Sequence, residues 1–372
     1  MAGTKIEWAD AVWNPVTGCT PCSPGCDHCY AKRMSVRLAG RCGYPPSPRQ
    51  FDVTLHQDVL EQPMHWRKPK RIFVCSMADL FHPDVPDAFL DRVFAMMLAS
   101  HVLTNHRHQD LVLTKRPERM RQYLIFREPD RLLQDWAEAG DRFIHLDNED
   151  VLFSESVGAM CSARWSASGI AETQPRPWSV PENCWPLPNV WLGVTAENQE
   201  MADARIPILL QTPAAVRFVS VEPMLGPVDL HIGESLGEDD SAVGWTRCVN
   251  GGRNHQHPLH ERRCLSGIDW VICGGETGPG ARPMHPDWAR SLRDQCQAAK
   301  VPFFFKQWGE WAPAAVPLVG MVGGPRQELI APDGTFGPAH DSVIVARIGK
   351  KTAGRRLDGR EWNEFPEEGK RQ

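Results

Sequence analysis

The stretch VWLGVTAENQEMADARIPILLQTPAAVRFVSVEPM, residues 190–224, decides the fold class. It begins and ends with apolar runs rich in β-branched residues, at 190–194 and 216–221, that do not alternate with polar residues. Such runs are typical of parallel strands covered on both faces. Between them, residues 200–210 have a helical pattern that Pro207 is expected to interrupt. A strand, a helix and a second strand in this order predict a parallel βαβ unit.

The same alternation extends along the chain on both sides of this unit. Further apolar runs predict strands, and two segments with one apolar face predict helices. The strands are expected at 71–75, 110–114, 269–273 and 301–305, with an early one near 51–55, and the helices at 87–100 and 286–299. We therefore predict an α/β fold, a complete or partial parallel (β/α) barrel, with an open doubly wound sheet as the alternative.

Two stretches interrupt this rhythm. Residues 141–188 are rich in Pro and Trp, and residues 231–267 are polar with many Gly and His. Because long loops inside a compact domain usually carry function or lack order, we interpret both as insertions on the barrel rim. Residues 1–311 are then expected to form the barrel, and residues 312–372 a C-terminal extension that wraps the barrel or frays.

Composition limits the possible partners. The chain has 372 residues and a net charge of −5, so it is expected to bind nucleic acid only through a local basic patch. It has no apolar run long enough to cross a membrane and no visible secretory signal. A cytoplasmic location with mostly reduced cysteines is therefore expected, and no membrane association.

Four of the 12 cysteines lie in the segment NPVTGCTPCSPGCDHCYA, residues 14–31. Cys22, Cys26 and Cys29 have the spacing Cys-x3-Cys-x2-Cys, with which three thiolates can hold three irons of a 4Fe–4S cluster. The fourth iron would stay open for S-adenosylmethionine (SAM), as in radical SAM enzymes. Together with Cys19, the same residues also resemble a four-cysteine zinc site. Zinc knuckles usually lie a dozen or more residues apart, so the spacing favours the iron–sulfur cluster.

Polar residues follow nearly every expected strand. In a parallel barrel the carboxyl ends of the strands meet on one face, where the chemistry of such folds is found. Helix capping is the plainer explanation for any one of these residues. As a set, we expect them to line one cavity with the cysteines. Cofactor binding is predicted for Ser76, Asp79, Glu197, Glu222, Gly274, Gly275 and Glu276, and catalytic roles for Cys75, Lys115 and Lys306.

Two further groups of residues are weaker candidates. Cys273 ends a strand as Cys75 does, and both are candidates for a hydrogen donor, although small buried core residues are the commoner case. Residues 248–264 hold two cysteines and three histidines, ligand types that suit zinc, or else form an ordinary surface loop.

Long motifs in the chain resemble one known family. They are IEWADAVWNPVTGC (6–19), PGCDHCYA (24–31), FVCSMADLFHPDVP (73–86), LVLTKRPERM (111–120), VWLGVTAENQ (190–199), RFVSVEPMLGP (217–227), DWVICGGETGPGARPMHPDW (269–288) and VPFFFKQWGEW (301–311). These stretches resemble a phage- and prophage-associated family that was long a domain of unknown function. That family is similar to radical SAM proteins near spore photoproduct lyase. The resemblance runs from about residue 6 to 312 and again near 349–366.

The resemblance implies a barrel of the radical SAM type with a 4Fe–4S cluster, SAM and a reductant such as flavodoxin or ferredoxin. Cys26 and Cys29 are ligands under either pattern. The family pattern places the third ligand at Cys19, whereas the generic spacing places it at Cys22. A nucleic acid base or nucleotide is the expected substrate, for repair or modification. The alternatives are a small molecule or peptide substrate, and a zinc-stabilised nucleic-acid-binding protein without catalysis.

Overall fold

The computed structural model describes residues 4, 6–103, 108–145, 151–159, 185–230, 267–314 and 325–367. The chain forms two compact units, and we describe each by itself. Unit 1 comprises Met1–Thr20, Ala31–Gly193 and Thr212–Ala215, and unit 2 comprises Pro21–Tyr30, Val194–Gln211 and Val216–Gln372.

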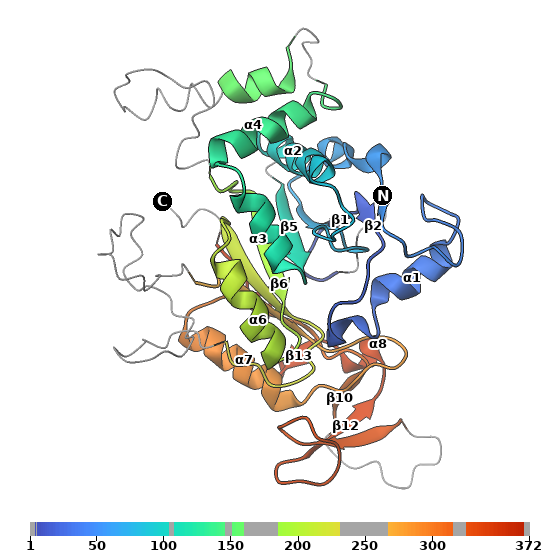
Figure 1. Cartoon of the computed structure of the whole chain (residues 1–372). Helices are drawn as coiled ribbons and strands as arrows, with labels where there is room; N and C mark the ends of the chain where they lie inside the picture. Colours follow the sequence, from blue (N-terminus) through green and yellow to red (C-terminus); the bar gives the residue numbers. More distant parts are fainter. Residues whose placement is uncertain are drawn as a thin grey trace. The chain divides into compact units, whose positions relative to one another are not determined.

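A seven-stranded sheet carries the fold, in the order β1-β4-β5-β6-β7-β8-β9. Three of its strands, β1, β5 and β6, are labelled in Figure 1. Its strands are β1 (Ala11–Trp13), β4 (Arg71–Val74), β5 (Gln109–Thr114), β6 (Val190–Thr195), β7 (Val216–Val221), β8 (Trp270–Gly274) and β9 (Phe303–Gln307). Their spatial order follows their order along the chain, without the reversal of a doubly wound sheet. Because β1 and β9 are the two edges, the described strands have the order of a partial, not a closed, parallel barrel.

Unit 1 packs its helices around a buried tyrosine. Its strands β1, β4 and β5 pair in parallel. Helix α2 (Asp87–Leu103) is buried almost all round and lies beside α4 (Pro129–Gly140), while α3 (Pro117–Ile125) precedes α4 (Figure 1). Tyr123 donates its hydroxyl to Asp91 at 2.7 Å and accepts from Trp136 Nε1 at 2.8 Å. These bonds satisfy the polar atoms that the aromatic core buries.

Asp110 of β5 is a buried carboxyl group with few hydrogen bonds. Its side chain accepts from Asn189 Nδ2 at 3.1 Å through Oδ2, while Oδ1 has no partner among the described residues. Burial raises the pKa of Asp110 from its ordinary value of 3.8 to about 7, although the bond from Asn189 lowers it. The folded protein therefore keeps this proton at pH values where the unfolded chain has lost it.

Replacing Asp110 with Asn is expected to make the protein less sensitive to alkaline pH. For a carboxyl whose pKa is raised on folding, stability falls between the unfolded value near 3.8 and the folded value near 7, by roughly 4 kcal/mol at most. Urea unfolding at pH 5 and pH 8 should show a smaller loss of stability in Asp110→Asn than in the natural protein. Equal losses in both proteins would contradict the assignment, and Asp203→Asn, at an exposed position, serves as the control.

Unit 2 contains β7, β8 and β9, paired in parallel, with two helices between strands. Helix α6 (Gln199–Leu210) begins after Asn198, whose side chain accepts from Met201 N at 3.0 Å and so caps the first turn. Helix α7 (Pro286–Ala298) begins with a proline, which the first turn tolerates. Trp270 of β8 packs against aromatic rings of both neighbouring strands, Phe218 and Phe304.

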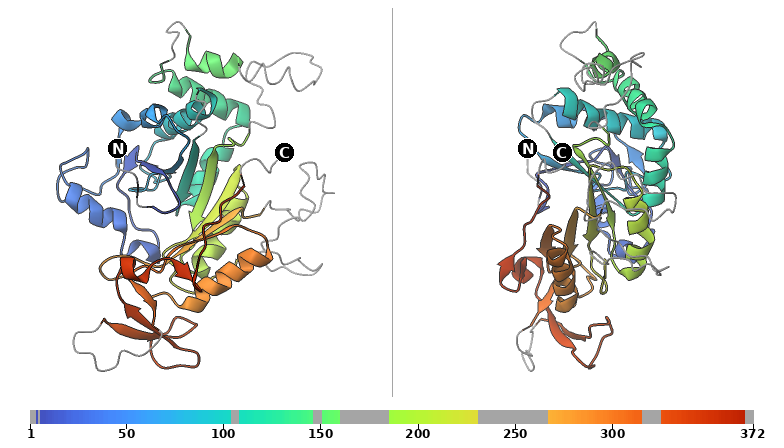
Figure 2. Two further views of the ribbon diagram at one scale, coloured as in Figure 1. Left: turned by 180° about the vertical axis from the view of Figure 1, so that it is seen from behind. Right: turned by 90° about the vertical axis from the view of Figure 1, so that its left-hand side faces the viewer.

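The C-terminal segment builds further antiparallel structure in unit 2. Strands β10 (Trp311–Pro313), β12 (Val343–Arg347) and β11 (Gln327–Ile330) form a three-stranded sheet, visible apart from α7 in Figure 2. The last described residues return to the edge strand β9, where Phe305 N donates to Trp362 O at 3.0 Å. Covering an edge strand in this way protects its unpaired backbone groups. The smaller elements are α8 (Lys350–Ala353), β13 (Arg356–Leu357) and β14 (Arg360–Glu361).

Most of the predicted strands and helices are confirmed, and two expectations were wrong. The run near 51–55 yields only β3 (Thr54–Leu55), which pairs with β2 (Val16–Thr17) in a small antiparallel ladder, while β1 is the first strand of the main sheet. Pro207 does not interrupt α6, which continues to Leu210 although the proline has no N–H to donate to the carbonyl four residues earlier. Between β3 and β4 lie two short 3-10 turns, Gln57–Val59 and Gln62–His65.

Several predictions lie outside what the structure describes. The two proposed insertions are mostly in residues 146–150, 160–184 and 231–266, and the Cys/His group at 248–264 lies wholly there. In the described part of the chain, no helix is both long and apolar enough to cross a membrane.

Candidate functional site

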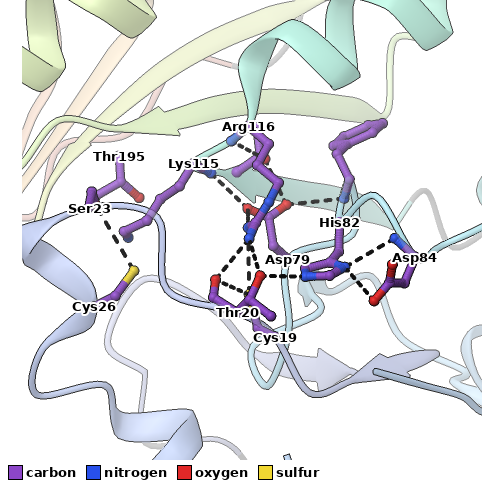
Figure 3. Close-up of polar contacts among 12 residues, drawn as sticks. Cys19, Thr20, Ser23, Cys26, Asp79, His82, Asp84, Lys115, Arg116 and Thr195 are labelled. Atoms are coloured by element: carbon purple, nitrogen blue, oxygen red, sulfur yellow. Dashed lines mark hydrogen bonds and ion pairs between the residues drawn. The ribbon is translucent and has the colours of Figure 1, made fainter. Parts of the chain in front are cut away.

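The cysteine segment forms a tight turn in unit 2. A short 3-10 helix spans Pro24–Cys26, and Cys29 N donates to Cys26 O at 3.2 Å just before α1 (Tyr30–Leu38) begins. Cys26 is half-buried, with Ser23 Oγ 3.9 Å from its Sγ (Figure 3), whereas Cys22 is exposed. We call residues 21–30 the cysteine loop. All eight cysteines in the described part of the chain are thiols, as an iron–sulfur site requires.

One anchor of the cysteine loop comes from the end of β6. Gly25 N donates to Glu197 Oε1 at 3.1 Å, and the fully buried Glu197 carboxylate forms an ion pair with Arg205 of α6 at 2.8 Å. A Cβ atom at residue 25 would lie 2.9 Å from Glu197 Oε1, which is closer than side chains pack. A larger residue at this position would therefore have to displace the buried Glu197 carboxylate.

A second anchor follows β8. Arg282 Nη2 donates to Pro24 O at 2.9 Å and Nη1 to Asp27 at 3.1 Å, while the same guanidinium holds Glu276 at 2.6 Å. Glu276 Oε2 also lies 3.0 Å from His28 Nδ1. Glu276 and Arg282 thus clamp both ends of the 3-10 turn that carries Cys26.

The Glu276 side chain is only 5% exposed, yet it stays charged. Burial alone would raise the pKa of Glu276, but hydrogen bonds from Arg282 and His28 outweigh burial and lower it below the ordinary value. Its carboxylate oxygens already accept hydrogen bonds from Arg282 and His28. A cofactor that contacts Glu276 directly would do so in addition to these bonds. The predicted role of Glu276 in cofactor binding stays a prediction.

A separate polar network surrounds Cys19 in unit 1 (Figure 3). Arg116 Nη1 donates to Cys19 Sγ at 3.5 Å and to Asp79 Oδ2 at 3.1 Å, and Nη2 donates to Thr20 O at 2.8 Å. Thr20 Oγ1 lies 2.8 Å from His82 Nε2. Arg116 thus places a positively charged group beside the sulfur of Cys19.

Asp79 is the centre of this network. Its carboxylate, in a residue only 6% exposed, accepts from Thr114 Oγ1 at 2.7 Å and from Lys115 N at 2.9 Å. It therefore joins the ends of β4 and β5. Ser76 lies nearby in the chain and donates to Asn14 Oδ1 at 3.1 Å.

The strand-end residues of β7, β8 and β9 meet in unit 2. Glu222, after β7, forms an ion pair with Lys306 at 2.8 Å and accepts from Gln307 Nε2 at 3.2 Å. Gly274 leaves room for this carboxylate, since a Cβ there would lie 3.2 Å from Glu222 Cδ. Gly275 N donates to Gln307 O at 2.9 Å, so this N–H group is already used in a backbone hydrogen bond between the ends of β8 and β9.

The two candidate hydrogen donors are core residues. Cys75 and Cys273 are both buried, and burial raises the pKa of each thiol well above its ordinary value. Cys273 Sγ lies 3.7 Å from Met224 Sδ. Both thiols therefore stay protonated at neutral pH, with packing as their evident role.

The strand-end residues that were predicted to line one cavity are divided between the two units. Asp79 and Lys115 are joined in unit 1, whereas Glu222 and Lys306 are joined in unit 2 and Glu197 and Glu276 hold the cysteine loop. A single cavity for all six stays a prediction. Sequence reasoning missed Arg205 and His28 as partners of buried carboxylates. A buried Glu needs a cationic or N–H partner, which signals that one exists but not which residue supplies it.

The donor chemistry of the cysteines suits an iron–sulfur cluster, although the sulfur atoms do not yet converge. Within the described ranges, no three Cys, His, Asp or Glu side chains are placed to hold a metal ion. Thiol sulfur is nonetheless the donor that iron–sulfur clusters take, and the turn is held by main-chain bonds that leave the cysteine side-chain torsions to adjust. The residues present therefore fit the group by type and spacing.

The fold and site define an α/β protein with a parallel sheet in partial-barrel order and a clamped cysteine loop. The chain belongs to the DUF5131 family, described as proteins of unknown function, whose model matches residues 3–366. No curated protein and no solved structure matches the chain.

Proposed function

We propose that this protein is a radical SAM enzyme whose 4Fe–4S cluster is bound by Cys26, Cys29 and a third cysteine, Cys19 or Cys22. The observation that carries the proposal is the cysteine loop itself. Its Cys-x3-Cys-x2-Cys spacing follows the first strand of a parallel sheet, and its turn is clamped to strand ends by Glu197, Glu276 and Arg282. Partners outside the thiols are what orient the ligands of a metal site.

Held by Cys26, Cys29 and the third cysteine, the cluster would supply the electron with which SAM gives methionine and, after taking a hydrogen atom from the substrate, 5′-deoxyadenosine. A flavodoxin or ferredoxin type of protein would supply this electron. The chain's own part is to hold the cysteine loop in place through Glu197, Glu276 and Arg282.

The substrate proposed is a nucleic acid base or nucleotide, for repair or modification. The net charge of −5 argues against tight binding of long duplex DNA. A stacked base cannot reach a site at the strand ends of a barrel, so the base must be unpaired or extruded.

Anaerobic reconstitution with iron and sulfide tests this proposal. We expect a brown protein that absorbs at roughly 400 nm, as iron–sulfur clusters do. Once dithionite is added, the protein should release 5′-deoxyadenosine from SAM. Single-stranded DNA, RNA or nucleotides should raise this release above the rate without substrate. A colourless protein that retains zinc would overturn the enzyme assignment and favour a zinc-stabilised binding protein. Stimulation by small molecules or peptides alone would overturn the substrate class.

A further inference from the structure

Gln307, the last residue of β9, carries a buried acceptor without a partner. The residue is 4% exposed, and its Oε1 has no hydrogen-bond partner among the described residues. The amide orientation is fixed by its other end, because Nε2 donates to Glu222 Oε1 at 3.2 Å and lies 3.5 Å from Gly275 O. Turning the amide over would bring two acceptor oxygens together at each contact. An unsatisfied buried acceptor is costly, so it points to an N–H or O–H donor that binds there.

A β-bulge brings Lys306 and Gln307 to the same carboxylate. Along a regular strand, neighbouring side chains point to opposite faces. Here the register with β8 shifts, so that Cys273 pairs with Phe305 and Gly274 pairs with Gln307. Lys306 is the extra residue, and both it and Gln307 reach Glu222. Bulges of this kind re-aim side chains beside functional sites.

The three side chains offer a defined set of hydrogen-bonding groups. Lys306 Nζ donates to both carboxylate oxygens of Glu222, at 2.8 and 3.0 Å, and has a third N–H. Glu222 Oε2 has lone pairs beyond the one that Lys306 uses, and Gln307 Oε1 adds another acceptor. With side chains 15% and 17% exposed, Lys306 and Glu222 can still be reached from solvent. Gln307 Oε1 is buried, so a ligand would meet Glu222 and Lys306 first and reach this atom only where the side chains above it move aside. The set comprises two acceptors and one donor, with no net charge.

We propose that Glu222, Lys306 and Gln307 recognise the Watson–Crick edge of an unpaired guanine. This inference rests on the proposed function, since it names the base that such an enzyme would bind. Guanine has two neighbouring N–H donor groups, at N1 and N2, beside the carbonyl oxygen O6. Adenine, cytosine and uracil lack that combination. Because the three side chains together have no net charge, they are suited to bind the base edge and not the phosphate. Gly274 is the residue that lets the Glu222 carboxylate lie in place.

Calorimetric titration of the reconstituted protein with GMP, IMP, AMP, CMP and UMP tests the site. GMP should bind about tenfold or more tightly than IMP, which lacks the N2 amino group, and the other nucleotides more weakly still. This comparison needs no variant. Gln307→Leu should lower the affinity for GMP by about tenfold or more, whereas Gln134→Leu, on the exposed face of α4, should not change it. If Gln307→Leu fails to fold, Gln307→Met, which keeps the length of the side chain, takes its place.

Equal affinities for all five nucleotides, or GMP binding unchanged by loss of Gln307, would overturn the proposal. An oligothymidylate carrying one guanine, compared with GMP, identifies the source: tighter binding of the oligonucleotide supports nucleic acid, and tighter binding of GMP supports the free nucleotide. SAM cleavage is measured separately. If SAM is cleaved but the protein does not prefer guanine, only this inference is overturned. If the protein prefers guanine but binds no iron–sulfur cluster, the proposed enzyme is overturned and the guanine site stands.

Discussion

Replacing Cys26 or Cys29 with Ala is expected to abolish the iron–sulfur cluster and all cleavage of SAM. In the proposed site both residues are ligands whichever cysteine is the third, and a cubane that loses one of three thiolates is expected to lose its attachment to the protein. Iron and sulfide content and the EPR signal after anaerobic reconstitution should fall to the background level. The matched control is Cys42→Ala, which removes an exposed thiol outside the cysteine loop. A full cluster in Cys26→Ala would defeat the assignment.

The same measurements choose the third ligand. The family resemblance favours Cys19, whose sulfur accepts a bond from Arg116, and we therefore expect Cys19→Ala to lose the cluster. Cys22 is exposed and is expected to be dispensable. Loss in Cys22→Ala with a normal cluster in Cys19→Ala would reverse this choice. Loss in neither single variant would mean that each replaces the other, which the double variant would then reveal.

The main strands and helices could be predicted because their signals are local. A run such as 216–221 is buried on both faces, and its composition alone shows this. The first strand was missed because it has no such local signal. Residues 11–13 are flanked by Asp10 and Asn14 and too short to stand out, whereas the run near 51–55 is apolar enough to mislead. Only pairing with β4, about 60 residues further on, makes 11–13 a strand.

The candidate site was predictable in its residue types but not in its pairings. Strand-end carboxylates such as Glu197 and Glu276 are visible in sequence because they interrupt apolar runs. Their partners are distant: Glu276 meets His28, 248 positions away. The β-bulge that turns Lys306 and Gln307 toward Glu222 leaves no mark on the sequence FFFKQ, because a register shift is a property of two strands.

Replacing Arg282 with Met is expected to release the cysteine loop and to weaken the cluster. The change removes four hydrogen bonds of one guanidinium, one to Pro24 O, one to Asp27 and two to the Glu276 carboxylate. Glu276 would then be a buried charge held by His28 and by the backbone N–H of residue 282, and breaking a buried pair typically costs about 3–5 kcal/mol. Partners outside the ligand set change metal affinity by about 10- to 100-fold. Arg290→Met is the control, because Arg290 pairs with Asp287 and Asp358 on the exposed side of α7.

A loss of clamping can be separated from a loss of folding. Hydrogen exchange should quicken in residues 21–30 of Arg282→Met, while the strands of unit 2 keep their protection. Adding Glu276→Gln removes the unpaired charge, so the double variant should regain part of the stability but not the iron content, since the bond to Pro24 O is still absent. If Arg282→Met keeps its iron and exchanges as slowly as Arg290→Met, the ion pair is incidental. The cysteine loop would then owe its position to Glu197 and Gly25, whose contact at 3.1 Å does not involve Arg282.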